Sequence, residues 1–174
     1  MVYEMLARIK SKLKKKRAQS FLTSVYGWHQ TCEDVSAVID DALHDQSIIR
    51  EDIGYLVDNT DKKLINLRYY IPDSLGTIKR RNPQLAKRFD LACQRIFLLR
   101  NATTSFLIRS QGPGPMLDDD PDEGIRMMYY YRALEEVGFK ARDLKKDLDR
   151  ELQYVWRDLQ SIILQEQLVA DLPI

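Results

Sequence analysis

The residues that could bind a transition metal are few in this chain of 174 residues, which holds two histidines and two cysteines. His29 and Cys32 lie three residues apart, a spacing that places two ligands on one side of a helix. A structural zinc site takes about four ligands, and Cys93 is the only other thiol. We expect Cys93 to lie toward the other half of its helix, away from this pair. The pattern therefore predicts a polar helix end and two separate thiols in a reducing compartment.

A second candidate arrangement is the pair Asp41 and His44, which has the carboxylate-to-histidine spacing of di-metal helical bundles. Those sites need a second such motif and two further Glu residues from facing helices. The sequence contains no second motif, so the pair is expected to be part of a helix surface. No catalytic residue, metal site or cofactor is predicted.

Arg100, Asn101 and Ser105 lie in the segment RNATTS of the third predicted helix. The segment RNATTS resembles the signature of the HEPN ribonucleases, in which Arg and a polar residue are followed by three residues and His. Arg100 and Asn101 match, and Ser105 stands where that family has His. The resemblance implies a helical bundle, and the missing His removes the general acid–base group that RNA cleavage needs. It therefore implies an inactive, degenerate relative.

Aromatic and basic side chains gather at residues 126–132. Tyr129, Tyr130 and Tyr131 are consecutive and are flanked by Arg126 and Arg132. Three consecutive residues of a helix cannot all face one core. Tyr, Met and Arg are enriched at protein–protein interfaces, whereas base stacking is the alternative use of such a cluster. We predict a protein partner, because the acidic segment nearby repels phosphate.

Basic residues are concentrated near the start of the chain, in the segment KSKLKKKRAQ. The apolar residues before and after this segment lie on different faces of a helix. Our leading interpretation is a solvated hinge at residues 14–17 between two helical halves. The candidate anion contacts in this segment are Lys12, Lys14, Lys15, Lys16 and Arg17.

Two other interpretations of the basic segment stay open. Residues 1–16 have the pattern of a basic amphipathic helix, which is typical of anchors on anionic membranes. In the second interpretation, the basic segment contacts a nucleic-acid backbone. The further residues expected to contact it are Lys79, Arg80, Arg81, Lys87 and Arg88.

The elements that must position these residues are helices, because apolar residues recur every three or four positions. We expect helices at residues 2–30, 32–70, 83–110 and 122–169, with a flexible linker at 111–121. Thr31 is the expected N-cap of the second helix, and a break within that helix at residues 45–47 is an alternative. Pro72 is expected to end the second helix, and Pro83 to begin the third. The predicted fold is all-α: a single-domain, up-down antiparallel bundle of four long helices.

The last predicted helix is about 70 Å long and the third about 40 Å, at 1.5 Å per residue. Either Gly138 interrupts the last helix or one of its ends projects from the bundle. A projecting apolar stripe needs a partner, and we expect Val155, Trp156 and Leu159 to form a seam in a homodimer.

Charge alternates along the chain although the net charge is only +1. Basic and acidic residues number seven and one in residues 1–31, two and nine in 32–62, ten and two in 63–117, and eight and fourteen in 118–174. Successive helices of an up-down bundle are neighbours, so the alternation predicts ion pairs between them. It also weakens the nucleic-acid interpretation, since a sequence pI near 7.7 is far from a strongly basic balance.

The expected function is that of a non-enzymatic interaction or assembly protein, which binds a protein partner or a second copy of itself. The alternatives are a nucleic-acid-binding bundle that resembles a degenerate HEPN protein, and a protein that binds a membrane surface. The sequence has no apolar run long enough to cross a membrane and lacks the pattern of a secretory signal, so a cytoplasmic location is expected.

Overall fold

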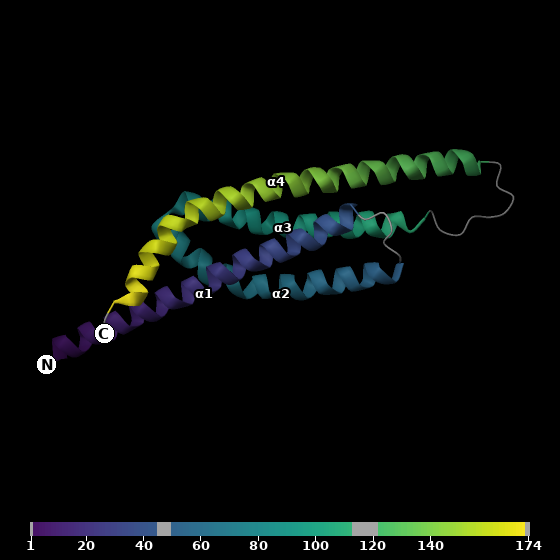
Figure 1. Ribbon diagram of the computed structural model, residues 1–174. Helices are drawn as coiled ribbons and strands as arrows, with labels where there is room; N and C mark the ends of the chain where they lie inside the picture. The colour runs from purple at the N-terminus through teal and green to yellow at the C-terminus, as the bar shows by residue number, and fades with distance from the viewer. Residues whose placement is uncertain (1, 45–49, 113–121, 173–174) are drawn as a thin grey trace.

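The protein folds as four helices that run up and down beside one another, as a computed structural model shows (Figure 1). The structure describes residues 2–44, 50–112 and 122–172. The helices are α1 (Val2–His44), α2 (Arg50–Arg81), α3 (Pro83–Ser110) and α4 (Glu123–Asp171). Each helix packs on the next one along the chain, and α4 packs back on α1. The predicted all-α bundle is confirmed, and the described residues contain no strand.

One apolar core fills the region in which the helices overlap. On α1, its members recur every three or four residues from Phe21 through Val25 to Trp28 and beyond. The Trp28 ring is fully buried and lies against Phe89 of α3, with 4.5 Å between the ring centroids. Burial of one such side chain stabilises the fold by roughly 1.5–3 kcal/mol, so these contacts fix how the helices align.

Ion pairs join every pair of neighbouring helices, and the predicted charge alternation accounts for part of them. They are Lys63–Asp34 between α2 and α1, Arg100–Asp61 between α3 and α2, Arg88 with Glu151 and Asp158 between α3 and α4, and Lys145–Asp40 between α4 and α1. The pairs made by residues 63–117 follow it, whereas no described pair between helices joins residues 1–31 to residues 32–62, and Lys145–Asp40 joins two net-acidic segments. Each partly exposed pair contributes little, about 0–1 kcal/mol. Together they favour this order of helices over others.

The predicted boundary between the first two helices is wrong. The Thr31 hydroxyl donates to the carbonyl oxygen of Gly27 at 2.7 Å, as side chains do inside a helix, and is not an N-cap. Because Cys32, Val35 and Ile39 continue the buried stripe, α1 runs on to His44. The alternative break at 45–47 lies outside the described residues.

The predicted end of the second helix is also wrong, since α2 continues through Pro72 to Arg81. Ser74, Thr77 and Ile78 are buried in this continuation, so tertiary packing outweighs the local preference against a helix before proline. The third helix begins at Pro83 as predicted. Its N-cap is Asn82, whose side chain accepts a hydrogen bond from the backbone N–H of Leu85 at 3.0 Å.

α4 has 49 residues and is unbroken at Gly138. Its N-terminal end extends past the end of α3, while its C-terminal half lies over the core (Figure 1). Val155 and Leu159 are fully buried there, so the predicted seam is wrong for these two residues. Gly138 instead lets α3 approach, because a Cβ at this position would lie 2.7 Å from the Phe106 ring.

The close approach at Gly138 predicts opposite effects for two glycine substitutions. Gly76 lies in α2 with no atom within 4 Å of an added Cβ, so Gly76→Ala should raise the free energy of unfolding by about 0.5–1 kcal/mol. Gly138→Ala brings the same gain in helix preference but forces Phe106 to move. We expect it to be about 1–3 kcal/mol less stable than Gly76→Ala in urea unfolding. Equal gains in both variants would contradict the close approach.

Candidate functional site

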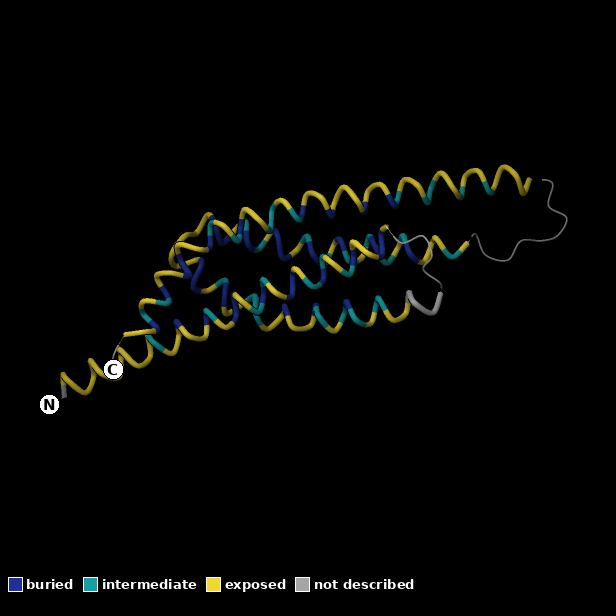
Figure 2. The backbone as a smooth tube through the Cα atoms, in the orientation of Figure 1, coloured by how far each residue is buried: buried dark blue, intermediate teal, exposed yellow. Residues whose placement is uncertain are grey.

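Residues 3–17 of α1, here called the projecting segment, extend beyond the core of the bundle (Figure 2). Every side chain in this range is exposed except that of Lys15, which is half-buried. α1 is one helix through the basic run, so the predicted hinge at residues 14–17 is wrong. The change of apolar face marks the point at which α1 enters the bundle, where Ala18 is buried.

An uncovered apolar stripe runs along the projecting segment. Leu6, Ile9 and Leu13 are 46, 44 and 50% exposed, and their spacing of four and three places them on one side of α1. Seven residues beyond Leu13, on the same side, the Ser20 hydroxyl donates to Asp73 of α2 at 3.3 Å. The stripe therefore continues the side of α1 that faces α2, past the point where α2 ends.

Positive charge surrounds this stripe. The projecting segment carries seven basic residues, Arg8, Lys10, Lys12, Lys14, Lys15, Lys16 and Arg17, and one acidic residue, Glu4. Within the described chain, no carboxylate forms an ion pair with any of the seven, and the Lys15 ammonium donates to the carbonyl oxygen of Leu172 at 3.2 Å. This end of the bundle is therefore amphipathic and uncompensated in charge.

The two predicted basic clusters meet at the base of the projecting segment. Lys14 and Arg17 of α1 line a hollow of about 360 Å³ together with Thr77, Arg80, Arg81, Glu166 and Val169, and we call this the basic hollow. The remaining basic candidates do not line it. Lys12 and Lys16 are exposed on α1, Lys79 and Lys87 are exposed on α2 and α3, and Arg88 is paired with carboxylates of α4.

The tyrosine cluster lies on the N-terminal end of α4 and is only partly available to a partner. The Tyr130 hydroxyl donates to the carbonyl oxygen of Arg109 and accepts from the Gly112 backbone N–H, so it ties α4 to the end of α3. Tyr129 and Tyr131 are 62 and 59% exposed. Arg126 and Arg132 are exposed as well.

The exposed residues of this cluster lie on two different sides of α4. Tyr129 lies on the outward side of α4 with Ile125, Met128 and Arg132, while Tyr131 lies on another side. We call Ile125, Met128, Tyr129 and Arg132 the outward patch. Ile125 was missed from the sequence, although its spacing of three from Met128 is visible there.

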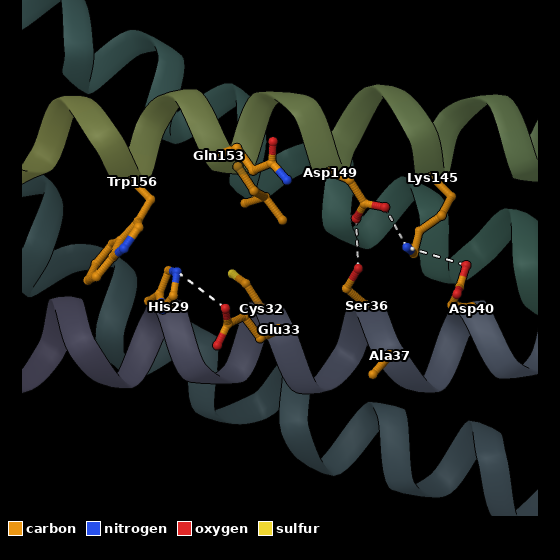
Figure 3. Close-up of a pocket in the computed structure, with 11 residues that line it drawn as sticks. His29, Cys32, Glu33, Ser36, Ala37, Asp40, Lys145, Asp149, Gln153 and Trp156 are labelled. Carbon is orange, nitrogen blue, oxygen red and sulfur yellow. Dashed lines mark hydrogen bonds and ion pairs between the residues drawn. The ribbon is translucent and has the colours of Figure 1, made fainter.

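A groove of about 520 Å³ separates α1 from α4 (Figure 3). At one end, the buried Lys145 ammonium lies 2.5 Å from Asp149 and 3.6 Å from Asp40, and Ser36 donates to Asp149 at 2.7 Å. The two carboxylates neutralise the buried cation, which would be costly without them. This network fixes α4 against α1. Only its Lys145–Asp149 pair, four residues apart, can be recognised from the sequence.

The other end of the groove is aromatic. Trp156, the third residue of the predicted seam, is half-buried and stacks on His29, with 3.7 Å between the ring centroids. Its indole ring is therefore used within the chain. Burial lowers the pKa of the His29 imidazole, and the nearby Glu33 carboxylate opposes that shift.

The two thiols are buried in the same core, which corrects the predicted separation of Cys93 from Cys32. Burial raises the pKa of Cys32 well above its usual value, with a further rise from Cys93 and Glu33. Burial also raises the pKa of Cys93 to about 12. Both thiols are therefore protonated at neutral pH and are poor nucleophiles and metal ligands. No group of three or more potential metal ligands is found among the described residues.

Arg100, from the HEPN-like segment, has a structural contact. Its guanidinium donates to both carboxylate oxygens of Asp61, at 2.8 and 2.6 Å, and so clamps α3 to α2. Neither His29 nor His44 is among the described residues that line the hollow with Arg100 and Asn101.

No protein-family model, curated protein or solved structure matches this chain. In the part of the chain that the structure describes, no helix is both long and apolar enough to cross a bilayer.

The His29–Trp156 stack predicts that stability falls in mild acid. Burial lowers the pKa of His29 in the folded protein, so as the pH falls the unfolded chain binds the imidazole proton first. The contribution of neutral His29 to the free energy of unfolding is therefore fully present above about pH 6.5, the ordinary pKa of histidine, and is lost below it. We expect the unfolding temperature to drop between pH 7.5 and 5.5. His29→Phe keeps a ring against Trp156 and should reduce that drop in thermal unfolding followed by circular dichroism. His44→Gln, on the exposed end of α1, is the control, and an unchanged drop in His29→Phe would refute this role.

Proposed function

We propose that this protein is a non-enzymatic interaction protein that binds an anionic membrane surface through the projecting segment of α1. The observation that supports this proposal is the uncovered stripe of Leu6, Ile9 and Leu13 within a segment of seven basic residues. A helix of this kind lies in the plane of the interface, with its apolar side among the acyl chains and its cations among the headgroups. Long Lys and Arg side chains on either side of the stripe can reach the headgroups while the stripe is buried.

Charge and apolar surface together favour a membrane over the other partners. Each basic residue near an anionic leaflet contributes about 1 kcal/mol of attraction. A nucleic-acid backbone would attract the same cations but would leave the three apolar side chains exposed. Two copies of the segment would repel one another, because each carries seven basic residues and one acidic residue.

The first test is co-sedimentation with vesicles. We expect binding to phosphatidylserine-containing vesicles that weakens with salt, and little binding to neutral phosphatidylcholine vesicles. Ile9→Asn with Leu13→Asn should weaken the binding by about tenfold or more, because two large apolar side chains no longer enter the interface.

The matched control for that double variant is Leu164→Asn with Leu168→Asn, which changes two exposed leucines on α4. It should bind vesicles as the unchanged protein does. Equal loss in both double variants, or binding to RNA in the absence of vesicle binding, would refute the membrane proposal.

A second candidate function is self-association through the outward patch on α4. This end of α4 extends past α3, and Ile125, Met128 and Tyr129 are 54, 57 and 62% exposed on it. Residues 123–140 carry three acidic and three basic side chains, so two antiparallel copies could pair without net repulsion. Tyr, Met and Arg are residue types that interfaces favour.

Light scattering tests this second candidate. We expect a dimer whose mass does not change with salt, and Met128→Ala with Tyr129→Ala should weaken it by about tenfold or more. Tyr69→Ala, which removes an exposed ring from α2, is the control and should leave the mass unchanged. A monomeric parent protein would rule out the patch as a dimer interface.

A further inference from the structure

The basic hollow lies where α1, the end of α2 and the end of α4 meet. Its lining has four cationic side chains, Lys14, Arg17, Arg80 and Arg81, and one carboxylate, Glu166. We propose that the basic hollow binds a phosphate monoester group, which carries close to two negative charges at neutral pH.

The charge of the hollow is only partly balanced within the chain. Glu166 is buried and is held by Arg81, whose Nε and Nη2 lie 3.0 and 2.8 Å from the same carboxylate oxygen. Arg80 donates to the Thr77 hydroxyl at 3.0 Å, which is a neutral partner. Within the described residues, Lys14 and Arg17 form no ion pair with a carboxylate. Three cations are therefore left for a ligand, more than one carboxylate group could neutralise.

The residue types in the hollow match phosphate in geometry as well as in charge. A guanidinium presents a planar set of donors that fits two oxygens of one phosphate, and Lys adds a compact point charge. The Thr77 hydroxyl accepts its bond from Arg80 and keeps its own hydrogen for a ligand oxygen. No aromatic side chain lines the hollow, so nothing in it can stack on a nucleotide base. The recognised group is therefore the phosphate itself.

The cations come from rigid elements that are far apart in the sequence. Lys14 and Arg17 share one side of α1, and Thr77, Arg80 and Arg81 lie in the last turns of α2. The Arg81–Glu166 pair joins the end of α2 to α4 and holds the third wall in place. Such a preformed site does not have to be ordered when the ligand binds, which favours affinity.

The phosphate can come from a lipid headgroup or from a soluble phosphorylated molecule. Arg17 and Lys14 belong both to the hollow and to the projecting segment, so a phosphorylated headgroup would reach the hollow when the stripe is in the interface. A lipid source of the phosphate therefore rests on the proposed membrane function and extends it. Binding of a soluble phosphate ester does not depend on a membrane.

The test is calorimetric titration of the full chain with inositol 1,4,5-trisphosphate, which supplies phosphate monoesters without a membrane. We expect saturable binding at one site. Lys14→Gln with Arg17→Gln should weaken it by about tenfold or more, because two charge-assisted contacts are lost. The matched control is Arg8→Gln with Lys12→Gln, which removes the same charge from the same helix but outside the hollow. It should weaken trisphosphate binding less than about threefold, because only long-range attraction is lost.

Vesicles then identify the source of the phosphate. Tighter binding to vesicles that contain phosphatidylinositol 4,5-bisphosphate than to phosphatidylserine vesicles of equal charge, lost in Lys14→Gln with Arg17→Gln, supports the site and assigns it to a headgroup. Binding of the trisphosphate without this vesicle preference supports the site with a soluble ligand. The inference is overturned if the trisphosphate does not bind, or if both double variants weaken it equally. The variants of Ile9 and Leu13 test membrane binding separately. If the phosphate proposal is wrong, trisphosphate binding is absent; if the membrane proposal is wrong, vesicle binding is absent.

Discussion

Four helices can share a core only where all four overlap, and the surfaces of this protein follow from that constraint. α3 has 28 residues and α2 has 32, whereas α1 has 43 and α4 has 49. The long helices therefore extend past the short ones, and the N-terminal ends of α1 and α4 do so at opposite ends of the bundle (Figure 1). On α1 the core begins at Ala18, and before it the apolar side chains of Leu6, Ile9 and Leu13 are left exposed by the described part of the chain. On α4 the surplus comes before Tyr130, whose hydroxyl bonds to the end of α3. Each overhang keeps the helical spacing of apolar residues without the partner that this spacing would bury.

Electrostatics distinguishes the two overhangs. Inside the bundle, ion pairs such as Arg100–Asp61 and Lys145–Asp40 match basic and acidic residues across each interface. The overhang of α4 is balanced in charge and can meet a second copy. The overhang of α1 is not balanced, and an anionic partner would relieve the repulsion among its cations. Apolar exposure alone does not tell which partner fits a surface. The charge around the apolar residues is the basis on which we propose a membrane for α1 and a second copy for α4.

The periodicity of apolar residues was enough to predict four helices, the bounds of α3 and its start at Pro83. Local signals failed where burial opposed them. Thr31 has the chemistry of an N-cap and Pro72 that of a helix end, yet each lies inside a helix whose buried stripe continues on both sides. The seam at Val155 and Leu159 failed for a related reason, because a core stripe and a dimer seam have the same spacing in sequence. Only the overlap with α1 and α3 decides that these side chains are covered by the chain itself.

The same continuation through Pro72 decides whether the basic hollow exists. A second helix that ended at Tyr70 would leave Thr77, Arg80 and Arg81 in a turn, and Lys14 would face no cation from another element. With α2 intact, both basic runs line one hollow, and Glu166 holds Arg81 in place from α4. The sequence identifies the basic segments of α1 and of α2 but does not show that they lie side by side. Leu13 and Arg17 are four residues apart on one rigid helix, about 6 Å along its axis. In the proposed membrane-bound state α1 lies in the plane of the interface, and this short spacing keeps the hollow beside the buried stripe. One helix would then set both the orientation of the protein and the position of the proposed anion site.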